Sequence, residues 1–216
     1  MNQRWLAYLS IGVFGTIVFV LFALRLQPVW RPEDATKPLP AEIAAPTVTF
    51  VDPALGPATA KVTLIVYGDF QCDYCGDASA AAQSVQRAYP KDVRVVWKDF
   101  PNASAHPEAV NAAVAAHCAA RQGKFWEYHD ALFLRRTLLS DEQYRQIARD
   151  VGLDGNTFAK CLDSQDSLPL VNRNLDESLG LRLTATPTVF INATRIVGAV
   201  SAEELLSYVR PILEAK

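Results

Sequence analysis

The sequence lacks an excess of positive charge, internal repeats and low-complexity tracts. Its 216 residues include 21 Lys and Arg against 23 Asp and Glu, for a formal net charge of -2. The sequence has no cluster of basic residues that could bind the phosphates of a nucleic acid, so no nucleic-acid partner is expected. Apolar residues make up 50% of the chain, which is enough for one compact domain with a sizeable core.

Histidine and methionine are scarce, and the positions of the possible ligands argue against a metal site. The only methionine is the first residue, and the histidines His106, His117 and His129 show no ligand spacing; we expect them on helix surfaces or in the core. Of the four cysteines, two lie close together in the sequence, and the other two, Cys118 and Cys161, lie far from that pair and from each other. Because zinc needs further ligands at suitable spacing, the sequence predicts no metal and no dissociable cofactor.

Charged residues are absent from one long run, Trp5 to Leu24. About 20 helical residues at roughly 1.5 Å each span about 30 Å, the thickness of the hydrocarbon layer of a membrane. No small-x-small cleavage site follows, which favours an uncleaved anchor, residues 1–26, over a cleaved secretory signal. The proline-rich residues 27–46 are expected to form a semi-rigid linker to a domain at 47–216.

The hydrophobic pattern of this domain predicts an α/β fold with an inserted helical region. Apolar β-branched runs indicate strands, and apolar positions three and four residues apart indicate helices. The expected strands are 47–50, 62–70, 93–100 and two that flank a turn at Asn192-Ala193; the expected helices follow Cys72, fill an insertion at about 104–180 and begin again at Ser201. The second and third strands, with the helix between them, form a β-α-β unit, so these strands should be parallel.

Two cysteines, Cys72 and Cys75, lie in the segment GDFQCDYCGDAS, at the expected junction of a strand and a helix. Free amides and the dipole of a helix N-terminus stabilise an anion, so the first cysteine should favour the thiolate. The second lies one turn on, should be more buried, and is spaced to attack a mixed disulfide on the first. Within a β-α-β unit, this spacing favours a redox dithiol over a zinc site or an inert disulfide.

Five motifs together resemble the DsbA-like family of thioredoxin-fold proteins. They are FQCDYC, KDFPN, CAARQGKFWEYHDALF, FAKCLDS and TPTVFINATRIVGA, and they span nearly everything from Val62 to the C-terminus. The resemblance implies a central mixed sheet flanked by helices, and a cis Thr186-Pro187 peptide that faces the dithiol and binds extended polypeptide. It also implies a disulfide between Cys118 and Cys161, which the residues alone would leave as either a disulfide or two buried thiols.

Positions near the dithiol are candidates for tuning its chemistry, namely Asp69, Asp73 and Tyr74. The pair Asp73-Tyr74 replaces the Pro-His of the most oxidising relatives, and the charge of Asp73 should make the first cysteine less acidic. Val66 stands where thioredoxin-like proteins often carry a buried acid, so a proton relay must use another group or water. Asp69 is nearer, but we expect a solvated carboxylate at a strand end, and we expect Lys98 at the surface.

The leading hypothesis is a membrane-tethered thiol–disulfide oxidoreductase that forms disulfide bonds in exported polypeptides. An unidentified redox partner would reset its dithiol. A structural disulfide persists in an oxidising space, which favours an extracytoplasmic, periplasmic domain, although Arg25 and Arg31 after the apolar run favour the opposite orientation. The alternatives are a disulfide reductase or isomerase on the same fold, a copper-binding carrier, which would lack nearby His or Met ligands, and a redox-inactive binding module.

Overall fold

The computed structural model describes Thr16 and residues 40–215, so the expected membrane anchor, apart from Thr16, and most of the expected linker lie outside the described residues. Within the described part, no helix has both the length and the apolar character needed to cross a membrane. The unit Pro40–Lys216 is compact and therefore begins within the stretch expected as a linker. Ile43 donates its amide to the carbonyl of Gly180 at 3.0 Å, which holds the end of that stretch on the domain.

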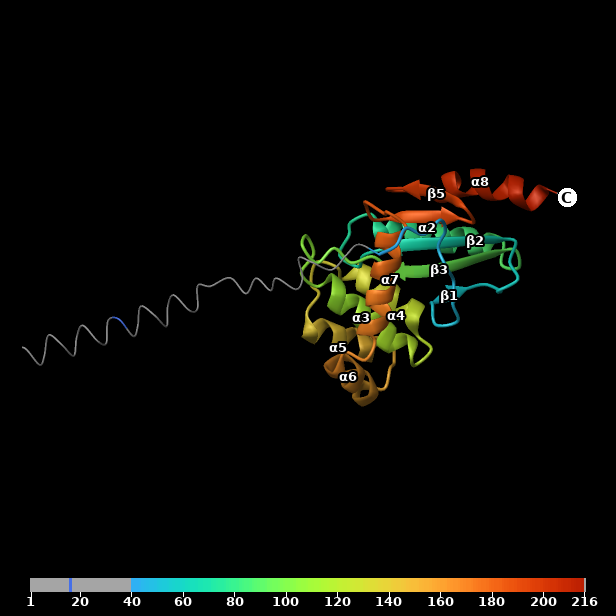
Figure 1. The fold of residues 1–216 in the computed structure, drawn as a ribbon. Coiled ribbons are helices and arrows are strands. Elements are labelled where there is room, and N and C mark those ends of the chain that lie inside the picture. The colour runs from blue at the N-terminus through green and yellow to red at the C-terminus, as the bar shows by residue number, and fades with distance from the viewer. Residues whose placement is uncertain (1–15, 17–39, 216) are drawn as a thin grey trace, which may run out of the picture. The chain divides into compact units, whose positions relative to one another are not determined.

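A mixed five-stranded sheet forms the centre of this unit, in the order β1-β3-β2-β4-β5 (Figure 1). The strands are β1 Ala54–Leu55, β2 Val62–Gly68, β3 Val93–Asp99, β4 Thr188–Ile191 and β5 Thr194–Val197. Strands β2 and β3 are parallel, with Val62 opposite Val93, and the other neighbouring pairs are antiparallel. The predicted parallel β-α-β unit is therefore confirmed, and the turn at Asn192 joins the predicted pair β4 and β5.

The helices of the described part follow the expected order. They are α2 Cys75–Ala88, α3 Ala109–Ala120, α4 Phe125–Leu134, α5 Asp141–Asp150, α6 Gly155–Ser164, α7 Leu168–Gly180 and α8 Ala202–Glu214. Figure 1 shows α5 and α6 on the opposite side of the sheet strands from α8 in that view. Three helices of the described part have side-chain caps, because Ser140, Asp154 and Ser201 each accept a backbone amide from the residue three positions on.

Each face of the sheet packs against a separate apolar cluster. On one face, Leu64 and Val66 of β2 pack with Ala82 of α2 and Leu205 of α8, in a cluster that continues into the helical insertion. On the other face, Ile65 and Tyr67 belong to a smaller cluster. The alternation follows from the two-residue period of a strand, which sends successive side chains to opposite faces.

The segment 47–50, expected as a strand, is not a strand, and the edge strand is β1 instead. The Thr47 amide donates to Glu177 at 2.7 Å, and the Thr49 amide donates to Asp52 at 2.6 Å. These amides are paired with carboxylates, so they are not available for a sheet ladder.

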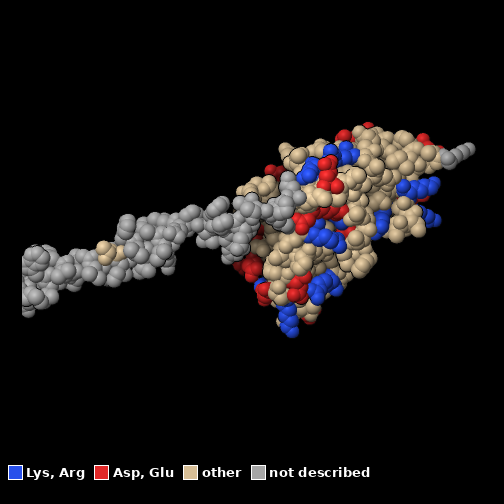
Figure 2. Space-filling model, viewed as in Figure 1, with Lys and Arg blue, Asp and Glu red and all other residues tan. Residues whose placement is uncertain are grey.

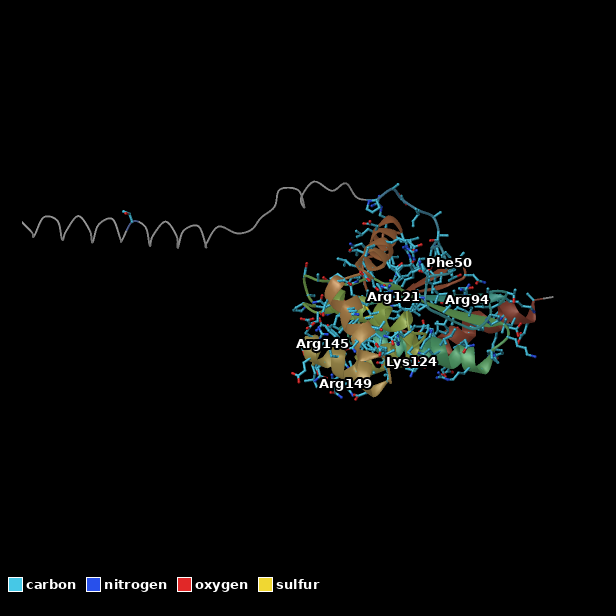
Figure 3. The ribbon with its side chains drawn as sticks, turned by 90° about the horizontal axis from the view of Figure 1, so that it is seen from below. Phe50, Arg94, Arg121, Lys124, Arg145 and Arg149 are labelled. Atoms are coloured by element: carbon cyan, nitrogen blue, oxygen red, sulfur yellow. A yellow bond between two sulfur atoms is a disulfide. The ribbon has the colours of Figure 1, made fainter. Side chains whose placement is uncertain are left out.

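Positive and negative side chains alternate on the viewed surface of the domain, without a broad area of one sign (Figure 2). Figure 3 shows basic side chains, among them Arg121 and Arg145, on the helical part of the molecule. Arg121 pairs with Asp166 at 2.9 Å and Arg145 with Asp163 at 2.6 Å. Acidic partners therefore offset this basic cluster.

Candidate active site

The two cysteines of the CxxC segment, Cys72 and Cys75, form a disulfide with their Cα atoms 5.4 Å apart. Helix α2 begins at Cys75, so the expectation of a helix from about Cys72 was early by three residues. The amide of Cys72 donates to the carbonyl of Asp69 at 3.1 Å in a turn, and Tyr74 takes the N-cap position. Cys75 is 0% exposed and Cys72 is 6% exposed, so the second cysteine is the more buried, as expected.

The loop before β4 brings Thr186 to the dithiol. The Thr186-Pro187 peptide is cis, and the carbonyl oxygen of Thr186 lies 3.7 Å from Sγ of Cys72. Pro187 is buried and leads directly into β4, which pairs with β2 just ahead of the CxxC segment. The sheet therefore places beside Cys72 a peptide that is far away in the sequence, as the family resemblance implied.

A cavity of about 310 Å³ adjoins Thr186. Its walls come from the loop after β3, from α7 and from the loop before β4, and they include Phe100, Asn102, Leu175 and Leu179. Its wall is therefore partly apolar and partly polar.

Asp69 is buried rather than solvated, which corrects the expectation from the sequence. It is 2% exposed, and its carboxylate accepts the amides of Gln71 and Asn102, each at 2.8 Å. His106 Nδ1 also lies 2.8 Å from Asp69 Oδ2. The carboxylate joins the dithiol loop to the loop after β3, and the sequence could not reveal that this second loop folds over the strand end.

Asp73 and Tyr74, the residues between the two cysteines, face outward. Tyr74 is 62% exposed, and the Asp73 side chain is 76% exposed and accepts Nε of Arg136 at 3.2 Å. Arg136, rather than Lys98, is thus the cation next to Asp73. Lys98 is 0% exposed, so the expectation of a surface lysine was wrong. Arg136 lies 63 residues from Asp73 in the sequence, and no local pattern pointed to it.

A second disulfide joins Cys118 of α3 to Cys161 of α6, with an S–S distance of 2.04 Å. The hydroxyl of Ser167 lies 3.8 Å and 3.7 Å from the two sulfurs. Both cysteines are buried, at 1% and 5% exposure. The disulfide cross-links two helices of the insertion, which is the pairing implied by the resemblance.

The histidines take part in hydrogen bonds rather than in a metal centre. Among the described residues, no group of three or more His, Cys, Asp or Glu side chains is arranged to hold a metal ion. His117 Nε2 lies 2.6 Å from Asp99, which also accepts Asn174 at 3.0 Å and Trp97 at 2.9 Å. Burial alone would raise the pKa of Asp99, but the charge and hydrogen bond of His117 hold it below its usual range.

Comparison with known proteins identifies the family of this chain. The family model Thioredoxin_4, described as thioredoxin, matches residues 49–210. The chain belongs to this thioredoxin family. Its CxxC pair, Cys72–Cys75, forms a disulfide and lies within the matched residues.

Solved structures agree with this thioredoxin fold. A thioredoxin-like oxidoreductase from Silicibacter pomeroyi DSS-3 is 27% identical, covers 78% of this chain and 95% of its own, and superposes with a TM-score of 0.64. The catalytic domain of Proteus mirabilis ScsC is 25% identical, with coverage of 76% and 90% and a TM-score of 0.65. BdbD from Bacillus subtilis, at 20% identity, 81% and 100% coverage and a TM-score of 0.68, shows the fold alone.

The curated relatives that match are longer proteins. A Na(+)/H(+) antiporter NhaA from Herminiimonas arsenicoxydans is 32% identical over 215 residues, which is 99% of this chain and 33% of the relative. An NhaA 3 antiporter from Salinispora tropica is 35% identical over 154 residues, 71% of this chain and 24% of the relative. The chain thus spans a quarter to a third of the length of these relatives.

Removing the charge of Asp73 and removing the charge of Arg136 should shift the pKa of the Cys72 thiol of the reduced protein in opposite directions. Asp73→Asn removes a like charge beside the forming thiolate and should lower the Cys72 pKa, whereas Arg136→Gln removes a cation and should raise it. Thiolate absorbance against pH, in a Cys75→Ser background, measures both. Asp163→Asn, at another arginine-paired and exposed aspartate, is the control and should leave the pKa unchanged. A Cys72 pKa that Asp73→Asn leaves unchanged or raises would contradict the tuning role.

Proposed function

We propose that this protein is a thiol–disulfide oxidoreductase that forms disulfide bonds in exported polypeptides, with Cys72 as the sulfur that reacts with substrate and Cys75 as its resolving partner. The observation that carries the proposal is the unequal exposure of the two sulfurs beside one peptide carbonyl. Cys72 is 6% exposed and lies 3.7 Å from the Thr186 oxygen, while Cys75 is 0% exposed. An incoming thiolate therefore reaches Cys72 first.

The reaction transfers two electrons from the substrate to the dithiol. A substrate thiolate attacks Sγ of Cys72, the Cys72–Cys75 bond breaks, and Cys75 leaves as a thiolate that takes up a proton. A second substrate thiolate then attacks the substrate sulfur of the mixed disulfide and releases Cys72. The substrate leaves with a new disulfide, and a separate oxidising partner must restore the Cys72–Cys75 bond.

Substrate recognition in this proposal uses the peptide backbone. An extended polypeptide would lie along Thr186-Pro187 and hydrogen-bond to the backbone there, which is the mode by which extended chains add to exposed peptide edges. The adjacent cavity of about 310 Å³, with Leu175 and Leu179 in its wall, would take an apolar side chain. Such a site recognises the extended backbone of a substrate more than its amino-acid sequence, which suits an enzyme with many substrates.

An extracytoplasmic location belongs to the same proposal, with residues 1–26 as a membrane anchor and a linker that ends where the compact unit begins, at Pro40. The Cys118–Cys161 disulfide supports it, because a buried structural disulfide persists in oxidising compartments and is rare in the cytosol. The expected partners are exported polypeptides with free thiols and a protein that reoxidises the dithiol.

The reduction potential of the Cys72–Cys75 pair tests the direction of the reaction. The full chain is equilibrated with glutathione mixtures and alkylated, and the CxxC peptide is quantified by mass spectrometry. Reference values are about -120 mV for DsbA and about -270 mV for thioredoxin. We expect a value on the oxidising side of this interval but below that of DsbA, because of Asp73. A value near -270 mV would overturn the oxidising direction and indicate a reductase or isomerase.

Two cysteine variants test the assigned roles. Cys72→Ser should abolish thiol–disulfide exchange, and Cys75→Ser should accumulate a mixed disulfide on Cys72, because the resolving sulfur is missing. Gel shift and mass spectrometry after incubation of the reduced variants with a test protein that carries a disulfide report both. Exchange that survives Cys72→Ser would contradict the assignment and favour a redox-inactive role for the pair.

A further inference from the structure

The chemistry of Cys75 requires a proton carrier that the dithiol loop itself does not supply. Cys75 is 0% exposed, so water cannot solvate its thiolate, and every cycle moves a proton on to it and off it again. Val66 on the neighbouring strand is also 0% exposed and carries no titratable group. Asp69 already accepts three donors.

A hydrogen-bonded chain of three side chains connects solvent to the buried face of α2. Ser79 Oγ lies 3.1 Å from Nε2 of His129, and His129 Nδ1 lies 2.8 Å from Oδ1 of Asp130. Ser79 and the His129 side chain are at most 1% exposed, while the Asp130 side chain is 54% exposed. Asp130 lines a cavity of about 380 Å³, which also borders Gly76 of the CxxC helix.

The inner end of this chain, Ser79, lies one helical turn after Cys75 on α2. Ser79 follows Cys75 by four residues on α2, and both residues are 0% exposed. Residues four apart on a helix share one face, with their Cβ atoms about 5–6 Å apart. Helical side chains also lean toward the N-terminus, so the Ser79 hydroxyl leans toward the turn that carries Cys75.

The surroundings favour a neutral imidazole at His129. Burial lowers the pKa of His129, and the hydrogen bond and charge of Asp130 and the charge of Asp99 only partly oppose it. Burial alone would raise the pKa of Asp130, but hydrogen bonds from His129 and from Gln83, at 3.0 Å, hold it below its usual range. An anionic Asp130 accepts Nδ1–H, which leaves Nε2 as the acceptor for Ser79. The other neighbours of the ring are aromatic: Phe70, Trp97, Phe125, Trp126 and Phe133.

We infer that Ser79, His129 and Asp130 relay the proton of Cys75. When Cys75 resolves a mixed disulfide, its S–H proton passes to Ser79 Oγ while the Ser79 proton passes to His129 Nε2. The Cys75 thiolate then attacks Sγ of Cys72, the Cys72–substrate bond breaks and the substrate leaves as a thiolate. The imidazolium, paired with Asp130, gives its proton to solvent in the cavity. In the reverse step the expelled Cys75 thiolate receives a proton along the same path.

This relay depends on the dithiol chemistry of the proposed function but not on its direction, because both oxidation and reduction move the Cys75 proton. A reduction potential near that of thioredoxin would therefore overturn the oxidising direction and leave the relay standing. The relay has its own readout, the pH dependence of the resolving step.

The test measures that step directly in the full chain. The reduced protein reacts with glutathione disulfide, and the release of glutathione from the Cys72 mixed disulfide is followed by stopped-flow and acid quench between pH 5 and 10. General acid–base catalysis contributes about 10²–10⁴-fold in enzymes, so Ser79→Ala should slow resolution at pH 6–7 by at least about tenfold. Above the pKa of the Cys75 thiol no proton remains to be removed, and the rates of variant and wild type should converge.

Two further variants separate relay from structure. Ser178→Ala is the matched control, because Ser178 is a 0% exposed helical serine that bonds to the Asn174 carbonyl and has no place in the chain of donors. It should keep the wild-type pH profile. Asp130→Asn, at the exposed end, should slow resolution at low pH only. A Ser79→Ala rate equal to wild type at every pH, or lowered by one factor at every pH, would overturn the relay.

Discussion

Replacing Lys98 with methionine is expected to lower the free energy of unfolding by about 3–5 kcal/mol, the cost of leaving a buried charge without its partner. Lys98 is 0% exposed, and its Nζ lies 3.0 Å from Asp52 and 2.9 Å from Glu177. Arg173 also pairs with Asp52 at 2.6 Å, so the variant leaves Glu177 as the less compensated carboxylate. Urea unfolding at pH 7, followed by circular dichroism, measures the change.

The matched control for this prediction is Lys91→Met, because Lys91 is exposed and surface substitutions usually change stability by less than about 0.5 kcal/mol. A loss below about 1 kcal/mol for the Lys98 variant would contradict the role of the buried network.

The cost of losing Lys98 should also shrink in acid. Burial alone would raise the pKa of Glu177, but hydrogen bonds from Thr47 and Lys98 and the charge of Lys98 bring it below its ordinary value of 4.5. A lowered carboxyl pKa stabilises the folded state above the ordinary value, and this stabilisation is lost as the pH falls through the lowered one. The difference between wild type and Lys98→Met should therefore be largest near neutral pH and narrow below about pH 4.5.

Removing the second disulfide should be nearly as costly. The double variant Cys118→Ala with Cys161→Ala opens a link between residues 43 positions apart, and the chain-entropy model gives a loss of about 4 kcal/mol for such a loop. Unfolding in the absence of added oxidant or reductant measures this loss of stability. The control, Cys72→Ala with Cys75→Ala, opens a link of separation 3 and should cost much less.

The same variant distinguishes a structural disulfide from a second redox centre. If Cys118–Cys161 only cross-links α3 and α6, the Cys72–Cys75 potential should stay within a few tens of millivolts of the wild-type value, since 30 mV corresponds to about 1.4 kcal/mol for a two-electron couple. A stability loss below 1 kcal/mol would contradict the cross-linking role. A large change in the potential would instead tie this disulfide to the active site.

The sequence alone determined the parts of this protein that depend on neighbours along the chain. The β-branched apolar runs predicted β2 and β3, the spacing of Cys72 and Cys75 predicted the dithiol, and Asn192 predicted the β4–β5 turn. Helix caps are local in the same way, because a cap joins a side chain to an amide only three residues away. Edge strand β1 was not predicted, because its two residues are too few to show an alternating hydrophobic pattern.

Only the tertiary structure decided which polar side chains near the site are buried and what they meet. Asp69 and Lys98 read as surface charges, yet loops and helices from 33 to 79 residues away supply Asn102 for the first and Glu177 for the second. In the sequence, Ser79 is an ordinary helix residue. In the structure, α4 places His129, which is 50 residues away in the sequence, within hydrogen-bond distance of it. Sequence periodicity reports which face of an element is apolar, but it contains no record of which distant polar groups pack together there. That is why the dithiol could be predicted from the sequence and its proposed proton path could not.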